Sequence, residues 1–351
     1  MKKERDSNFE LLRIIAMYMI VLIHANIFLG EFAAYEIAGK YNGVVNGISN
    51  TGVSLFILIS GYFGVSFNIK KLTKLECKMI VYSLIVLAVS LLAYGNTMSG
   101  GDKLELLAKS LLPFSSRNHW FYSCYVLIVL FSEFIEKFIS TLDRQNFRAF
   151  IVLMLCCFSI LPTLLYFEIV QDNGKGLIQM FMMYMVGRYI RLYGEDFGEK
   201  HKKWVVGCFW MMWLVNYLSF KHPINIGGIY HTLSKDNSIT NVMLAVSLFY
   251  IFKGIKLKSK VVNIVASYIF AVFAMNYLLI NIAIDLIKAR MPWITDQGPW
   301  GFWVIPVLSL IILALCILVG VIRDFLLGRV DDVIAEFVEK RLRKLESAIK
   351  G

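Results

Sequence analysis

The chain has 351 residues, of which 58% are hydrophobic and 17% charged, and its formal net charge is +11. Soluble domains are about 45–50% apolar, so this composition excludes an ordinary soluble protein and predicts an all-α polytopic membrane protein. The positive charge does not indicate a nucleic-acid partner, because the Lys and Arg residues stand in short clusters between apolar stretches. Such clusters are typical of the cytoplasmic loops of membrane proteins.

Ten apolar stretches are interpreted as membrane helices. They cover residues 9–29, 48–67, 77–94, 120–139, 149–168, 177–192, 204–219, 239–253, 261–284 and 301–321. Ten spans place both termini on one side, and with the N-terminus inside, 27 of the 36 Lys and Arg residues fall in inner segments. Because cytoplasmic segments carry such an excess, both termini are predicted to be cytoplasmic.

The first span, from Ser7 to Phe28, carries two residues that membrane helices normally avoid. Arg13 and His24 are eleven positions apart, close to three helical turns, so both project from one face and lie about 16 Å apart along the axis. Ionisable residues inside a span mark candidate functional sites. His24 fits either a proton-transferring imidazole or a packing histidine bonded to a backbone carbonyl. Arg13 alone is typical of an anchor at the inner interface, paired with Glu10 one turn earlier.

The second span ends in Ser-Gly-Tyr at 60–62 and leads into a basic inner loop. Small residues let another backbone or a ligand approach closely. In the loop, Lys71 and Lys74 are three positions apart and share a face if the segment is helical. With Arg13 they would form a cationic patch suited to phosphate groups. The alternative is that they supply only the positive charge of an inner loop.

The chain enters the fourth span from outside through RNHWFYSCY, residues 117–125. Its Trp and Tyr residues are typical of an interfacial aromatic belt. Aromatic faces also stack on sugars, so Arg117, His119 and Trp120 are candidates for an acceptor site.

The segment after the last span combines an apolar helical stripe with a charged opposite face. Helices of this kind lie in the interface of a membrane leaflet. Residues 329–351 are therefore predicted to form an amphipathic helix in contact with lipid of the inner leaflet, and residues 1–328 a single membrane domain. A helix that binds a partner protein is the alternative.

The chain resembles the acyltransferase-3 family of integral membrane acyltransferases, which typically modify cell-surface polysaccharides. ELLRIIAMYMIVLIHA has the family's acidic residue, its Leu-x-Arg-x-Ile-Ala and its His eleven positions after the Arg, at Glu10, Arg13 and His24. VSLFILISGY resembles the family's apolar run into Ser-Gly-Phe or Ser-Gly-Tyr, and HWFYSCYVLIVLFS is similar to a later Trp-Phe…Tyr…Leu segment. The resemblance covers about residues 7 to 321.

Two positions depart from the family pattern. Lys71 and Lys74 resemble a basic-x-x-basic element with Lys in place of Arg, and lysine cannot bind phosphate bidentately as arginine does. SYIFAVFAMNYLL, residues 267–279, looks like a segment that often carries His where this chain has Asn276. A mechanism that needs a second histidine would not work here unaltered.

The resemblance implies an enzyme of the cell (inner) membrane that takes an acyl group from cytoplasmic acetyl-CoA. The implied acceptor is a sugar hydroxyl of a surface polysaccharide or its lipid-linked precursor; a succinyl group or an amine acceptor fits the same residues. No metal is expected, because the six cysteines stand without a CxxC or a His cluster. The predicted site comprises catalytic His24 and Glu10, donor-binding Arg13, Lys71 and Lys74, and substrate-binding Ser60, Tyr62, Arg117, His119, Trp120 and Asn276.

Two other classes of function stay open at this point. A transporter of a lipid-linked sugar or small solute would use ten helices and acidic residues such as Glu133, Glu168 and Asp285, but the halves show no internal repeat of the kind that transporters often have. A non-catalytic scaffold of a polysaccharide assembly complex would use the tail as its docking helix. Covalent transfer of a labelled acyl group separates an enzyme from both.

Overall fold

A computed structural model gives the fold and describes residues 6–32, 35–116, 119–166, 168–226, 229–294 and 301–350. Each predicted span overlaps at least one helix of this model. The helices concerned are α1 (Ser7–Ala25), α5 (Gly52–Phe63), α6 (Ile69–Tyr94), α8 (Trp120–Leu130), α9 (Ser132–Ser140), α10 (Arg144–Leu155), α12 (Leu177–Tyr193), α14 (Lys202–Lys221), α15 (Ile239–Lys253), α16 (Lys260–Ser267), α17 (Ile269–Arg290) and α18 (Gly301–Lys350).

Short elements connect these helices. They are η1 (Asn26–Phe28), α2 (Leu29–Phe32), α3 (Tyr35–Tyr41), η2 (Asn42–Asn46), α4 (Gly47–Ser49), α7 (Gly100–Leu111), η3 (Cys156–Ile160), α11 (Leu161–Leu165), α13 (Phe197–Lys200) and η4 (Pro292–Ile294). The sheet of the described residues is one antiparallel hairpin, β1 (Ile224–Ile226) with β2 (Ile229–His231), in which Asn225 is opposite Tyr230.

Six helical stretches of the described chain are long and apolar enough to cross a membrane. They are Ser7–Phe28, Ile37–Phe63, Ile69–Tyr94, Arg144–Leu165, Ile269–Arg290 and Phe302–Leu345. Trp120–Leu130 and Ile239–Lys253 are apolar but shorter. The protein is thus an all-helical multi-pass membrane protein, as predicted, while the count of ten spans and the cytoplasmic position of both termini stay predictions.

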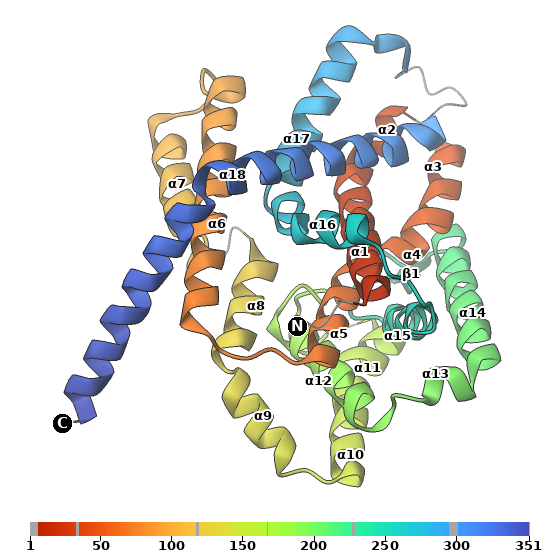
Figure 1. Cartoon of the computed structure of the whole chain (residues 1–351). Helices are drawn as coiled ribbons and strands as arrows, with labels where there is room; N and C mark the ends of the chain where they lie inside the picture. Colours follow the sequence, from red (N-terminus) through yellow and green to blue (C-terminus); the bar gives the residue numbers. More distant parts are fainter. Residues whose placement is uncertain are drawn as a thin grey trace.

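Helix α1 lies in the middle of the molecule, between two hydrophobic clusters (Figure 1). Its first half, with Phe9 and Leu12, packs into a cluster shared with α5, α12 and α15. Its second half, with Val21 and Leu22, packs into a cluster shared with α6, α17 and α18. Any group carried on α1 is therefore held from both sides by packed helices, and His24 stands on its last turn.

Two glycines let α5 and α12 cross in close contact. A β-carbon at Gly61 would lie 2.2 Å from the carbonyl oxygen of Tyr184, and one at Gly187 would lie 2.4 Å from the carbonyl oxygen of Leu58. Neither distance is possible for a real side chain. The Ser-Gly-Tyr motif of the second span thus has a packing role at its central glycine, of the kind that small residues have between membrane helices.

The tail belongs to one helix, α18, which continues without a break through the predicted boundary at 328. Its acidic residues form ion pairs with a row of lysines on α6: Glu336 with Lys70, Asp332 with Lys74, and Asp324 with Lys78. Apolar side chains of the tail, including Phe325, Val333 and Phe337, stay exposed, as expected of an amphipathic helix. The division at 328 and the contact of the tail with lipid stay predictions.

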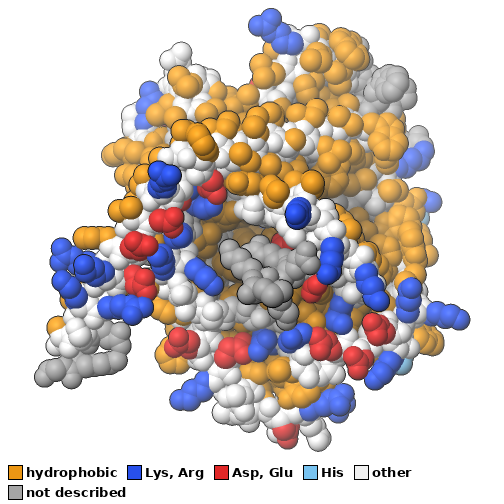
Figure 2. Space-filling model, in the orientation of Figure 1, with side chains coloured by type: hydrophobic (Ala, Val, Ile, Leu, Met, Phe, Trp, Pro, Cys, Tyr) orange, Lys and Arg blue, Asp and Glu red, His pale blue; other side chains and the backbone are white. Residues whose placement is uncertain are grey.

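Charge is unevenly distributed over the face shown in Figure 2. Lys, Arg, Asp and Glu side chains gather over its lower part, and hydrophobic side chains cover much of its upper part (Figure 2). The charged part is the side on which the end of α18 and the α9–α10 connection lie (Figure 1). This distribution fits an aqueous inner surface next to the hydrocarbon region.

Candidate functional site

The side chain of His24 is hydrogen-bonded to Asn276 on α17, with 2.6 Å between Nδ1 and Oδ1. The amide nitrogen of Asn276 donates to the carbonyl oxygens of Val272 at 2.8 Å and Phe273 at 3.0 Å. Because this nitrogen is committed to α17, the oxygen of Asn276 faces the imidazole and accepts a hydrogen bond from Nδ1–H. The Nε2 atom of His24 then carries a lone pair and is available as a base.

A cavity of about 490 Å³ opens on one side of His24. Its walls come from α6, α7, α8 and α17, near the end of α6 that is predicted to face outside. Five aromatic side chains stand in these walls: Tyr94, Trp120, Phe121, Phe273 and Tyr277. Hydrogen-bonding groups are added by Ser90, His119 and Asn281. An aromatic cavity with a few polar groups suits a sugar, because aromatic faces pack on sugar rings while hydroxyls need polar partners.

A smaller cavity of about 120 Å³ adjoins His24 and shares Trp120, Phe121 and Phe273 with the larger one. Met17, Ile20, Val53 and Phe56 form an apolar part of its wall. Met17 lies seven residues before His24, so this cavity extends roughly 10 Å along α1 toward Arg13. The imidazole is therefore in contact with two spaces, one wide and aromatic, the other narrow and directed toward the inner surface.

Polar groups of Asn50 and of two loops that are predicted to be outer reach the smaller cavity beside His24. Asn50, Lys175 and Asp236 contribute to its lining. The amide nitrogen of Asn50 donates to the carbonyl oxygen of Ser234 at 2.5 Å and to its hydroxyl oxygen at 3.1 Å, and that of Gln179 donates to the carbonyl oxygen of Asp236 at 3.1 Å. These bonds hold the loop 232–238 against the starts of α5 and α12.

The neighbouring loop, residues 168–176, is locked to the loop 232–238. Gly174 has φ +78°, and a β-carbon there would lie 2.5 Å from the backbone nitrogen of Asn237, so both the conformation and the close approach require glycine. Burial raises the pKa of the Asp236 carboxyl to about 7, with a further increase from Asp172 and an opposing effect from the positive charge of Lys175.

The predicted donor-binding residues lie in the N-terminal parts of α1 and α6, which are predicted to be the inner ends of these helices. Arg13 is paired with Glu10 at 2.8 Å, and its guanidinium carbon lies 5.8 Å from the centre of the Phe63 ring. On α6, Lys71 is exposed and Lys74 is paired with Asp332 of the tail. Glu10 is fourteen residues from His24 on the same helix, about 21 Å along the axis. The carboxylate of Glu10 thus contacts Arg13, and its distance along the helix keeps it away from the imidazole of His24.

The structure brings four of the predicted residues together: His24, His119, Trp120 and Asn276 line the same cavity. Ser60 and Tyr62 are elsewhere; neither is among the described residues that line the two cavities beside His24. The Ser60 hydroxyl donates to the carbonyl oxygen of Phe56 at 2.9 Å, and the Tyr62 hydroxyl donates to Glu195 at 2.7 Å. Arg117 lies outside the described residues.

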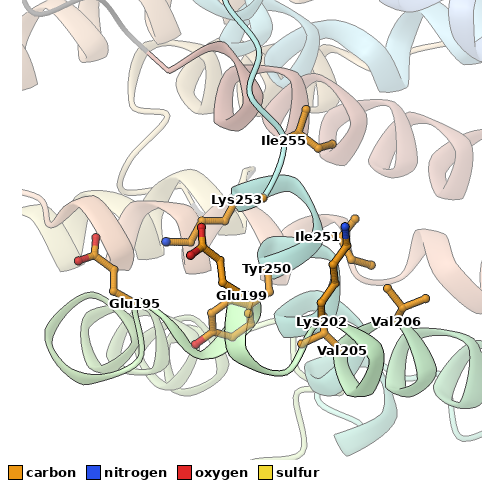
Figure 3. Close-up of a pocket in the computed structure, with 11 residues that line it drawn as sticks. Glu195, Glu199, Lys202, Val205, Val206, Tyr250, Ile251, Lys253 and Ile255 are labelled. Atoms are coloured by element: carbon orange, nitrogen blue, oxygen red, sulfur yellow. The ribbon is translucent and has the colours of Figure 1, made fainter.

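A separate cavity of about 300 Å³ lies near the C-terminal ends of α12 and α15, which are predicted to be inner. Figure 3 shows Glu195, Glu199 and Lys202, from the segment between α12 and the start of α14, and Lys253 at the end of α15, around this space. Two carboxylates balance two ammonium groups, so this cavity has no net charge that would favour an anion such as the phosphates of a nucleotide. It also contains neither Arg13 nor His24 among its lining residues.

Sequence reasoning missed Lys175 and Asp236 as neighbours of His24. Both lie in connections that were interpreted as outer loops, where charged residues are ordinary, and no spacing links either to the first span. The sequence DNGK at 172–175 was the one signal that could have drawn attention to Lys175. Asn-Gly marks a tight turn, and here this turn leads directly into α12.

Comparison with known proteins gives the class of this protein. An all-helical membrane protein with an available imidazole between two cavities fits a membrane-bound group-transfer enzyme. Residues 6–321 match the model of the acyltransferase-3 family, described as an acyltransferase domain, so the chain belongs to this family and is an acyltransferase. No curated protein and no solved structure matches the chain. Within the described residues, no group of three or more His, Cys, Asp and Glu could hold a metal ion.

Proposed function

We propose that the protein is an O-acyltransferase of the cell (inner) membrane that transfers an acetyl group from cytoplasmic acetyl-CoA to a sugar hydroxyl. The acceptor is a surface polysaccharide or its lipid-linked precursor. The observation that carries this proposal is the bond between His24 and Asn276, because it leaves Nε2 as a base between two cavities. A base in this position serves a transfer between a donor on one side and an acceptor on the other.

The donor is assigned to the smaller cavity. Its apolar wall along Met17, Ile20 and Val53 suits the narrow pantetheine arm of acetyl-CoA, and it extends toward Arg13. The phosphates would then bind at the inner surface to Arg13, Lys71 and Lys74. The pair between Lys74 and Asp332 does not prevent this, because both side chains are partly exposed, at 36% and 53%, and such pairs contribute about 0–1 kcal/mol.

The acceptor is assigned to the larger cavity. Its aromatic side chains, above all Trp120 and Phe121, offer faces for a sugar ring, and His119 offers a hydrogen-bonding edge. Trp120 and Phe121 line both cavities, so a sugar packed on them would lie next to the donor. Arg117 stays a predicted substrate-binding residue.

The reaction needs one proton transfer in each direction. As the sugar oxygen attacks the thioester carbonyl carbon, its proton passes to Nε2 of His24. The new C–O bond forms and the C–S bond breaks. The proton on Nε2 then neutralises the CoA thiolate, so the products are the acetyl ester and free CoA.

Three predicted residues take indirect roles in this proposal. Glu10 orients Arg13 through their ion pair and does not exchange a proton with His24. Ser60 and Tyr62 shape the packing between α5 and α12 and the inner end of the molecule, through the contacts of Ser60 with its own helix and of Tyr62 with Glu195.

Mass spectrometry of surface glycans tests this proposal in cells that lack the gene and carry it on a plasmid. We expect acetylated glycan with the wild type and with His222→Ala, whose imidazole is exposed at the end of α14. We expect none with His24→Ala at an equal amount of membrane-inserted protein. Normal acetylation by His24→Ala would show that the imidazole is not the base.

A further inference from the structure

The polar end of the smaller cavity holds a positive charge that the reaction scheme above does not use. Lys175 lines this cavity together with His24. The lysine precedes α12 by two residues, in the loop that Gly174 locks to residue 237. Its backbone position is therefore fixed, although it belongs to a connection and not to a helix.

Two of the other polar side chains at this end, Asn50 and Ser49, already donate to other groups, and the third, Asp236, is a carboxyl group. The amide nitrogen of Asn50 uses its two protons on Ser234. The hydroxyl of Ser49 donates to the carbonyl oxygen of Val45 at 2.8 Å. Asp236 presents a carboxyl group whose charged form would face the ammonium group as a counter-charge. Among the described residues that line this cavity, Lys175 carries the one Lys or Arg side chain, so it supplies a donor with a permanent positive charge beside the ligand space.

Acyl transfer requires such a donor. When an oxygen nucleophile attacks a thioester, the carbonyl oxygen becomes negatively charged in the tetrahedral intermediate. Preorganised donors aimed at this oxygen, in a site that excludes water, commonly supply the largest part of the rate enhancement. Irregular backbone is tolerated inside a membrane protein where it lines a cavity of this kind.

We propose that Lys175 is a second catalytic residue, whose ammonium group stabilises the oxyanion formed on the thioester carbonyl in the smaller cavity. The inference rests on the proposed function. His24 takes the proton of the attacking hydroxyl, and Lys175 neutralises the charge that develops on the carbonyl oxygen. The oxyanion then collapses, the C–S bond breaks, and the thiolate takes the proton from His24, so Lys175 keeps its own proton throughout.

The test compares Lys175→Gln and Lys175→Met with Lys103→Gln, which removes an exposed lysine of α7. Purified proteins in liposomes receive labelled acetyl-CoA and glycan isolated from cells that lack the gene. We expect kcat to fall about 10²–10³-fold in both Lys175 variants, as for the loss of one oxyanion donor, with the KM for acetyl-CoA changed less than about threefold. Lys103→Gln keeps the wild-type kcat.

Three results would overturn this inference or the proposed function, and they are distinguishable. A wild-type kcat in either Lys175 variant, with His24→Ala inactive, removes Lys175 from catalysis and leaves the proposed function intact. Activity in His24→Ala removes the proposed function itself. Binding of labelled acetyl-CoA to each preparation shows that the variants are folded. If a Lys175 variant loses this binding together with its activity, the lysine serves the fold or the donor site, and the proposal is contradicted.

Discussion

Replacing Asn276 by Leu removes the group that fixes the tautomer of His24. Leucine has nearly the same shape as asparagine but accepts no hydrogen bond. The bond from Nδ1 of His24 to the side-chain oxygen of Asn276 is 2.6 Å long, and such bonds contribute about 0.5–1.5 kcal/mol net. Since 1.4 kcal/mol corresponds to a factor of ten, we expect kcat to fall up to about tenfold as the imidazole divides between two tautomers. The KM for acetyl-CoA should not change, because the proposed site for the donor phosphates is at the other end of α1.

The assay measures release of free CoA with a thiol reagent, using purified protein in liposomes. Asn276→Asp is the matched variant, because it keeps an oxygen acceptor for His24, although it replaces the nitrogen that donates to the carbonyl oxygens of Val272 and Phe273 by a carboxyl oxygen. Those carbonyls belong to α17 and keep their helical partners. We expect Asn276→Asp to be clearly more active than Asn276→Leu. A wild-type kcat for the leucine variant would refute the assignment of the tautomer.

Three further outcomes follow from single contacts. Gly61→Ala places a β-carbon 2.2 Å from the carbonyl oxygen of Tyr184, so the free energy of unfolding should fall by about 1–3 kcal/mol. Thermal unfolding in detergent would show this loss as a lower Tm. An unchanged Tm would contradict the close crossing of α5 and α12. Asp332→Asn should release Lys74 from its ion pair and lower the KM for acetyl-CoA up to about fivefold, since exposed pairs contribute at most about 1 kcal/mol. An unchanged KM would show that Lys74 does not belong to the donor site. The pKa of Asp236 is raised from 3.8 to about 7 by burial, so the folded protein keeps this proton after the unfolded chain has lost it, and this residue lowers stability as pH rises from about 4 to 7. The Tm of Asp236→Asn relative to wild type should therefore be higher at pH 8 than at pH 5, and a difference independent of pH would contradict the burial of this carboxyl.

Gly61→Ala has a matched control in the same protein. A β-carbon at Gly207 of α14 would meet nothing within 4 Å. Gly207→Ala should therefore leave Tm unchanged or raise it, because alanine stabilises a helix interior by about 0.5–1 kcal/mol relative to glycine. Opposite signs for the two substitutions separate a packing effect from a helix-propensity effect.

The class of fold and the first helix could be predicted from sequence because both follow from periodicity. Apolar stretches of membrane length fix the helices, and a separation of eleven residues places Arg13 and His24 on one face whatever the rest of the chain does. The amphipathic character of the tail is visible in the same way. Its ion pairs with α6 were not predicted, because Lys74 and Asp332 are far apart in the chain and nothing local to either specifies the other.

The candidate site could be predicted only in part. Asn276 was identified as a position of interest and assigned to the substrate, whereas its side chain holds the imidazole of His24; that contact depends on how α1 and α17 pack. The Ser-Gly-Tyr motif drew attention to its side chains, although the closest contact belongs to the glycine between them. Lys175 was not identified, because hydropathy assigns its loop to the aqueous outer side and cannot show that the loop reaches the cavity beside His24.

The central claim is that the imidazole of His24 transfers the proton in a covalent acetyl transfer. The most direct measurement follows the label from labelled acetyl-CoA into glycan, with purified wild-type protein and with His24→Ala in the same liposomes. We expect covalently bound label to accumulate with the wild type and to stay at background with His24→Ala, while both preparations bind acetyl-CoA. Equal accumulation with both proteins, or label that crosses the membrane without becoming attached to glycan, would contradict the account.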